Sequence, residues 1–206
     1  MYLPSQFSAK ERAQALDLMR EYPLASLIST DHEQLPFVTH LPLHWEERGE
    51  KMVLQGHCAL ANPHWKYLQD RPKAVVTFMG PQAYMSAKVY PDLVRVPTWS
   101  YLAVHCTVQA HLLTDVDSKE QVLKQLIGDH DPAYDAQWHK LDRSYQLRML
   151  SGIVAFELEV VDLQCKIKLN QHRPESHASM YSTYVQGNHD EQALAQWMLR
   201  LGLVEG

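Results

Sequence analysis

The chain has 206 residues, of which 46% are hydrophobic and 21% charged, and its formal net charge is −5 at pH 7. This length favours one domain with a sizeable core, and the composition excludes extensive disorder. The acidic balance argues against a surface that binds nucleic acid by neutralising many phosphates. Three cysteines without a CxxC pair fit a reducing compartment, and no apolar run approaches the roughly 20 residues that span a bilayer, so we expect a cytoplasmic protein without membrane contact.

The first half of the chain predicts one helix followed by short strands. Ser8 and Glu11 have the spacing of a capping box, which predicts a helix that runs to about Tyr22. Runs of apolar residues between turn signals then predict four strands and a short helix between the last two of them. The predicted strands are 24–30, 37–43, 52–57 and 74–79, with a turn at 31–34.

Two longer strands are predicted in the second half, at 101–112 and 152–163. In the first, Leu102 and Val104 begin an apolar series that alternates with polar residues such as His105. This alternation gives one dry and one wet face, which is typical of antiparallel sheets.

Helices are predicted at 118–127, where Gly128 is a natural C-terminal cap, at 145–150, and before Gly202 near the C-terminus. Six or more short strands with helices outside them favour an α+β protein built on an antiparallel, closed or split β-barrel. We therefore expect a single domain over 1–206, with peripheral helical additions at about 118–150 and 174–203 and a C-terminal helix.

The segment 56–66 is the first candidate site. A predicted strand ends here, Asn62 can cap the following helix, and Pro63 suits its first turn. A helix start offers free backbone N–H groups, and His57 and His64 lie beside it, so a phosphate would be stabilised. The alternative is an ordinary capped helix with solvated histidines.

Two further clusters could contact a ligand. Aromatic and hydroxyl residues gather at 78–86 and 96–101, as a flat heteroaromatic ring with polar edges requires, although Trp99 and Tyr101 could equally be core residues. Lys166, Lys168 and Arg173 could meet an anion or form a solvated basic face.

Twelve histidines raise the question of a metal site. The pairs His57-Cys58 and His105-Cys106 are suggestive, but neighbouring residues on a strand face opposite ways and cannot easily share one ion. No metal site is predicted.

These clusters, in this order, resemble the PaiB-type family, the FMN-binding negative transcriptional regulators with a split-barrel fold. The resemblance runs nearly end to end and is strongest in four groups of residues. They are Gly56-His57 with Ala61-Asn62-Pro63-His64-Trp65, Gly80-Pro81 with Ala83-Tyr84, Val96-Pro97-Thr98-Trp99 with Tyr101 and Val104-His105, and Lys168-Leu169 with Gln171 and Arg173. The chain departs from the family pattern at Ala87, Val89, Ser100, Val108 and Asn170.

The resemblance implies an FMN-binding split barrel of the α+β class that forms a homodimer, with flavin between the two chains. It implies that the phosphate meets His57, Asn62 and His64, with Lys168 or Arg173 adding charge. The ring is expected near Thr39, His40, Tyr84, Ser86 and Trp99, with Gln171 bonding its polar edge.

The resemblance implies a flavin-dependent or redox-responsive regulator, which the sequence equips with no DNA-binding motif of its own, so direct nucleic-acid binding is not expected. The alternatives are a flavin-dependent oxidoreductase of the pyridoxamine-phosphate oxidase or flavin reductase type, and a haem-handling protein with His57 or His105 as axial ligand. The sequence assigns no catalytic residue and does not decide between regulator and enzyme.

Overall fold

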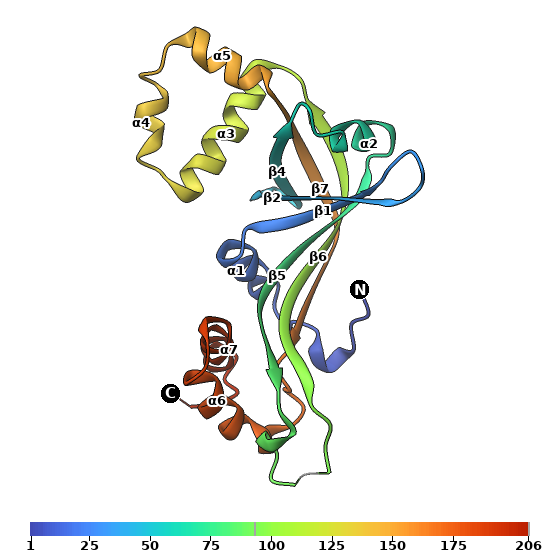
Figure 1. Ribbon diagram of the computed structural model, residues 1–206, viewed down its shortest axis with the longest axis vertical. Coiled ribbons are helices and arrows are strands. Elements are labelled where there is room, and N and C mark those ends of the chain that lie inside the picture. The colour runs from blue at the N-terminus through green and yellow to red at the C-terminus, as the bar shows by residue number, and fades with distance from the viewer. Residues whose placement is uncertain (93, 206) are drawn as a thin grey trace. The chain divides into compact units, whose positions relative to one another are not determined.

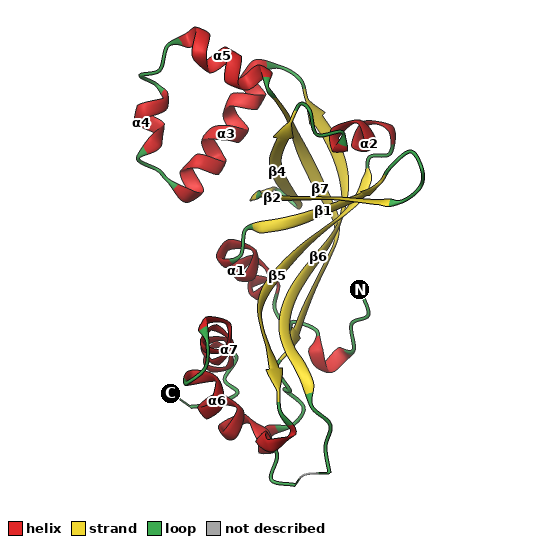
Figure 2. Ribbon diagram, viewed as in Figure 1, coloured by secondary structure: helices red, strands yellow, loops and turns green. Residues whose placement is uncertain are grey.

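The computed structural model describes residues 1–92 and 94–205, and within them seven strands form one sheet (Figures 1 and 2). The strand order is β2-β1-β5-β6-β7-β4-β3, so the described sheet is open, as a split barrel requires. The pairs β1–β2, β3–β4 and β4–β7 are antiparallel. The strands are β1 (Leu24–Thr30), β2 (Pro36–Pro42), β3 (His44–Arg48), β4 (Lys51–Ala59), β5 (Lys73–Met85), β6 (Thr98–Leu113) and β7 (Ile153–Lys168).

Helices lie outside the sheet, and the chain ends on one of them, as predicted. The helices are α1 (Arg12–Glu21), α2 (His64–Asp70), α3 (Val116–His130), α4 (Tyr134–Trp138), α5 (Arg143–Ser151), α6 (His177–Val185) and α7 (His189–Arg200). Short 3-10 turns, η1 (Ser5–Phe7), η2 (Ala87–Val89) and η3 (Pro174–Ser176), complete the described elements. Among the described residues, no helix combines the length and apolar character that crossing a membrane requires.

The chain divides into two compact units. Unit 1 comprises Met1–Tyr22, Phe78–Val104 and Gln164–Gly206, and unit 2 comprises Pro23–Thr77 and His105–Leu163. Helices α1, α6 and α7 belong to unit 1, whereas strands β1 to β4 and helices α2 to α5 belong to unit 2. The long strands β5, β6 and β7 contribute residues to both.

Unit 2 is built on the β1–β2 hairpin and on β4, which pairs with β3 and β7. Helix α2 packs against β1 and β2, and this contact brings the start of α2 to the middle of β2. Helix α3 packs on β3 and β4, where Val122 and Leu126 are buried against Ala155 of β7. Apolar faces of a helix and a sheet cover each other in this way.

Unit 1 packs α1 closely against a strand. Leu18 and Met19 of α1 are fully buried. A Cβ atom on Gly80 of β5 would lie 2.5 Å from Leu18 Cδ1 and 3.2 Å from Leu102 Cβ, so the absence of a side chain permits this approach. Helices α6 and α7 pack side by side (Figure 1), burying Tyr184 and Met198.

The predicted start of the first helix is wrong by one turn. Helix α1 begins at Arg12, with Glu11 as its N-cap and Gln14 completing the capping box. The Gln14 Oε1 atom accepts from the N–H groups of Lys10 at 3.1 Å and Glu11 at 3.5 Å. Ser8 instead forms an isolated β-bridge with Lys166, because the chain before the helix is extended.

Other boundaries also differ from the predictions. Helix α3 continues through Gly128 to His130, because an uncrowded glycine with ordinary φ does not stop a helix whose apolar face is buried. Strand β5 continues six residues further, through Gly80 and Pro81, and β7 five residues further. Strand β3 was not predicted, and helices α4 and α6 lie in the stretches 118–150 and 174–203, which were predicted as helical additions without separate bounds for these two helices.

Candidate functional site

In unit 2, the structure brings together Thr39, Asn62 and His64. Asn62 Nδ2 donates to Thr39 Oγ1 at 3.2 Å, and His64 Nδ1 lies 2.7 Å from the same oxygen. Phe37 and His64 meet edge to face, with ring centroids 5.1 Å apart. Three of the residues predicted to bind the cofactor therefore form one hydrogen-bonded group.

One ring nitrogen of His64 is used inside this group and the other is not. The Thr39 hydroxyl, which accepts from Asn62, either donates to His64 Nδ1 or accepts from it, depending on the tautomer of the ring. His64 Nε2 is buried and has no hydrogen-bond partner among the described residues. His64 is 1% exposed, and burial lowers its pKa from 6.5 to about 4. His64 thus holds a neutral, buried and unused ring nitrogen.

A second buried histidine nitrogen lies on β4. His57 is half-buried, its Nδ1 atom has no partner within the described chain, and burial lowers its pKa below the ordinary value. An unpaired buried polar atom costs free energy, and such atoms often mark the place of an absent ligand or water. His40, by contrast, is exposed on β2, where its Nδ1 lies 3.0 Å from Ser26 Oγ.

The start of α2 does not offer the free N–H groups that the sequence suggested. The His64 N–H donates to Asn62 Oδ1 at 3.0 Å, and the Lys66 N–H donates to the Pro63 carbonyl at 2.9 Å. The Trp65 N–H is bonded to Cys58. The described chain therefore satisfies these donors itself, and α2 is an ordinary capped helix at its backbone.

In unit 1, Tyr84 at the end of β5 and Trp99 at the start of β6 form an exposed aromatic pair. Their ring centroids are 6.3 Å apart at an interplanar angle of 63°, and Trp99 Nε1 donates to Gln82 Oε1 at 3.0 Å. The two side chains remain 54% and 48% exposed, so neither is an ordinary core residue. Ser86, also predicted to lie near the ring, caps η2 by accepting from the Lys88 N–H at 3.2 Å.

Two lysines of β7 share one aromatic ring in unit 1. Lys166 Nζ lies 5.4 Å and Lys168 Nζ 5.8 Å from the centre of the Tyr101 ring. Lys168 also donates to Thr98 Oγ1 at 2.6 Å, and burial, with the repulsion of Lys166, lowers its pKa. Neither lysine has a carboxylate within ion-pair distance in the described chain. Lys166 and Lys168 are two residues apart on β7, and alternation places the side chains of such residues on the same face of a strand. A sequence prediction that extended β7 to its full length would therefore have paired them.

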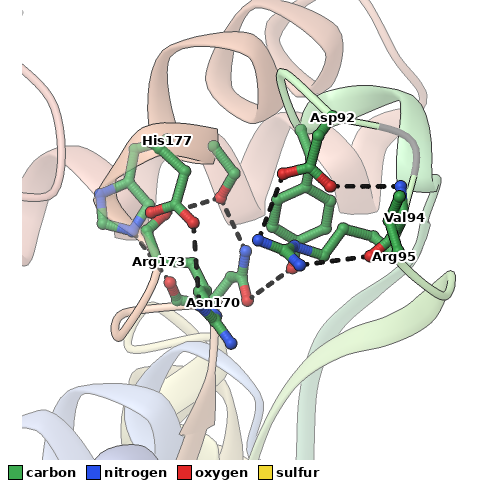
Figure 3. A network of polar contacts seen from close by, with 9 residues as sticks. Asp92, Val94, Arg95, Asn170, Arg173 and His177 are labelled. Carbon is green, nitrogen blue, oxygen red and sulfur yellow. Dashed lines mark hydrogen bonds and ion pairs between the residues drawn. The ribbon is translucent and has the colours of Figure 1, made fainter.

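Gln171 and Arg173 lie after β7 and make other contacts. Gln171 Nε2 donates to the Ile167 carbonyl at 2.5 Å, and its Oε1 accepts from the Leu169 N–H at 3.0 Å, so this amide braces the end of the strand. Arg173 is exposed, and its nearest acidic partner is Glu175 at 3.9 Å (Figure 3).

The departures from the family pattern are mostly buried. Asn170 has φ of 60° and bonds Tyr90 and Ser176 through its side chain (Figure 3). Ser100 is 1% exposed and its Oγ accepts from Tyr184 at 2.9 Å. Val89 and Val108 are buried as well, and Ala87 is half-buried in η2. Four of these five residues are therefore part of the protein's interior.

An open antiparallel sheet with peripheral helices and buried, unpaired ring nitrogens beside its strands defines an α+β split-barrel protein with a candidate ligand site. Residues 1–162 match the family described as "Putative FMN-binding domain", and the chain belongs to that family. The predicted class of cofactor, FMN, and the resemblance on which it was based are thereby confirmed.

Known proteins agree with this assignment. The chain is 31% identical over 178 residues to "Protease synthase and sporulation protein PAI 2" of Bacillus subtilis, covering 85% of this chain and 84% of the relative. Among solved structures, the flavocytochrome Anf3 of Azotobacter vinelandii matches with a TM-score of 0.59 at 17% identity, over 80% of this chain and 70% of that one. The FAD and heme binding protein of Mycobacterium smegmatis matches with a TM-score of 0.58 at 18% identity, over 79% and 74%. At these identities the two structures show the fold alone, and they confirm it.

Proposed function

We propose that this protein is an FMN-dependent regulator in which the buried ring nitrogen of His64 and the free ring nitrogen of His57 contact the uncharged part of the flavin. The observation that carries the proposal is the unused His64 Nε2, which is buried and neutral. A neutral ring nitrogen in a poorly solvated place suits an uncharged polar group better than a dianionic phosphate, whose desolvation would go uncompensated.

The hydrogen-bonding groups of the candidate site suit such a ligand. Thr39 and Asn62 hold the His64 ring in one orientation, and Phe37 covers its edge, so the ring nitrogen is fixed before a ligand arrives. FMN, when bound, supplies the redox chemistry, while these residues orient it and exclude water.

The N–H groups at the start of α2 are already used, so they offer the phosphate no free donor. In unit 1, Lys166 and Lys168 are cations without a carboxylate partner in the described residues, and the charge that Lys168 is expected to add at the phosphate stays a prediction. Arg173 is exposed and has an acidic neighbour, so we give it no role.

We also propose that two copies pair through the aromatic surface of unit 1. Tyr84 and Trp99 are exposed, and so are Val94 and Val96 of the segment that precedes β6, which are 85% and 79% exposed. An apolar surface of this kind is stabilised by burial against a second copy, and aromatic anchors dominate such interfaces.

Regulation through a protein partner or a small molecule fits better than direct DNA binding, because the net charge is −5. The Bacillus subtilis relative, whose name refers to protease synthase and sporulation, supports a regulatory role. We place the protein in the cytoplasm, since Cys58, Cys106 and Cys165 are all free thiols. A gel shift at physiological salt that is tight and sequence-selective would contradict the indirect mode of action.

The test is a comparison of FMN and riboflavin in two variants. The absorption spectrum of the purified protein first identifies a flavin or a haem, and a haem spectrum would refute the proposal. His64→Phe keeps the bulk of the ring and removes the ring nitrogen, so it should weaken FMN and riboflavin equally, by about tenfold.

Titration calorimetry measures both ligands, and His32→Ala, a change at an exposed histidine of unit 2, is the matched control. If His64→Phe weakens FMN while leaving riboflavin unchanged, His64 contacts the phosphate. If it weakens neither ligand, the unused nitrogen belongs to no flavin site.

A further inference from the structure

A pocket of about 570 Å³ lies in unit 2, and its described lining does not include Thr39, Asn62 or His64. It is formed by α2, the end of β6 and the beginning of α3, with Val154 of β7 also contributing to its wall. Its volume falls within the range of small-molecule sites in proteins. The functions proposed above make no use of it.

The floor and walls of this pocket are mainly apolar. Leu68, Ala110 and Val154 are buried residues that line it, and the indole of Trp65 forms an aromatic wall. Trp65 Nε1 donates to the Leu60 carbonyl at 3.0 Å, which fixes the orientation of the ring. A rigid indole beside aliphatic side chains favours a flat apolar molecule.

The described lining of the pocket contains one lysine, Lys119, and one histidine, His111. Lys119, in the first turns of α3, lines it and forms no ion pair within the described residues, whereas Lys124 of the same helix lies 3.7 Å from Glu120. The lining contains no aspartate or glutamate. Asp115, close to Lys119 in sequence, is occupied as the N-cap of α3, where it accepts from the Ser118 N–H at 2.8 Å.

We propose that this pocket binds a small carboxylic acid with a flat apolar body, whose carboxylate pairs with Lys119 and whose ring packs against Trp65. The apolar part gains free energy from burial, and the ammonium group selects an anion over a neutral molecule of the same shape. Gln69 and Gln109 line the same pocket and provide amide donors for the remaining carboxylate oxygen. The site is independent of flavin, so its failure would leave the FMN proposal intact.

Calorimetric titration with 2-naphthoate and its neutral counterpart 2-naphthamide tests the proposal. We expect Lys119→Met to weaken 2-naphthoate about tenfold and to leave 2-naphthamide unchanged, since only the acid uses the charge. Lys124→Met is the matched control on the same helix and should change neither.

Ala110→Phe, which fills the pocket, should abolish binding of both compounds, with circular dichroism confirming that the variant is folded. A Kd of 2-naphthoate that Lys119→Met leaves unchanged would overturn the proposal. So would the absence of any binding at millimolar concentrations, or binding that persists in a folded Ala110→Phe variant.

Discussion

The imidazole of His177 joins the turn after β7 to the C-terminus, because its Nε2 lies 3.0 Å from the carbonyl of Asn170 (Figure 3). Its Nδ1 lies 3.2 Å from the carbonyl of Leu203. A neutral imidazole has one N–H and can donate to one of these oxygens, whereas the protonated ring donates to both. The side chain is buried, so this contact orders unit 1 from within.

We expect His177→Ala to lower the free energy of unfolding by about 2 kcal/mol, because it removes a buried ring and leaves carbonyl oxygens unpaired. Urea unfolding followed by circular dichroism measures this. His189→Ala, at an exposed histidine of α7, is the control and should change stability by less than about 0.5 kcal/mol. Equal effects of the two changes would show that the His177 contacts contribute nothing.

The Tyr90–Asn170 hydrogen bond should show a measurable coupling. Tyr90 donates to Asn170 Oδ1 at 3.1 Å, and Asn170 has φ of 60°, which glycine also adopts without strain. Tyr90→Phe and Asn170→Gly therefore remove the hydrogen bond from either side with little change to the backbone. We expect a coupling of about 1 kcal/mol in a double-mutant cycle measured by urea unfolding. Strict additivity would contradict it.

Acid should destabilise the protein through His64. Burial lowers the pKa of this histidine from 6.5 to about 4, so the unfolded chain takes up a proton that the folded chain refuses. The stability is fully present above pH 6.5 and is lost as the pH falls toward about 4, by roughly 3 kcal/mol in total. His57, whose pKa burial also lowers, acts in the same direction.

The measurement is the difference between wild type and His64→Phe, unfolded in urea at several pH values between about 7 and 5. The phenylalanine does not titrate, so the variant should lose less stability than wild type as the pH falls. Parallel pH profiles would show that folding does not lower the pKa of His64.

The architecture could be predicted from the sequence because alternation is a local signal. The alternation of apolar and polar residues predicted the strands at 101–112 and 152–163. These strands, together with the predicted helices, indicated an antiparallel sheet with helices outside it. Boundaries were less predictable, since Gly80 and Pro81 look like a strand end. Only the packing of Leu18 against Gly80 shows why β5 continues there.

The residues of the candidate site could be predicted from the sequence, but their hydrogen bonds and protonation could not. Thr39, Asn62 and His64 were all predicted to bind the cofactor, and the structure joins them. Asn62 accepts a hydrogen bond from the first N–H of α2, and His64 Nε2 has no partner among the described residues. Both facts depend on distances between β2 and α2 that no sequence pattern encodes. The phosphate contact expected for His64 stays a prediction, beside the contact with the uncharged part of the flavin proposed above.

The aromatic pair of unit 1 leads to a prediction about assembly. Trp99 is 48% exposed although its indole is large, and it stands beside Tyr84 with only Gln82 fixing its Nε1. Truncating a central aromatic anchor typically costs an interface 2 kcal/mol or more, roughly a thirtyfold weakening. We therefore expect a homodimer in wild type and a predominantly monomeric Trp99→Ala at micromolar concentration, observed by light scattering.

Tyr145→Ala removes a comparably exposed aromatic residue from α5 of unit 2 and should leave the dimer unchanged. Because Trp99 contributes little to the interior of its own unit, thermal unfolding of the variant should stay close to wild type when both are measured as monomers. A wild type that is monomeric at all concentrations would contradict the proposed dimer. A dimer that persists in Trp99→Ala would show that its interface lies elsewhere.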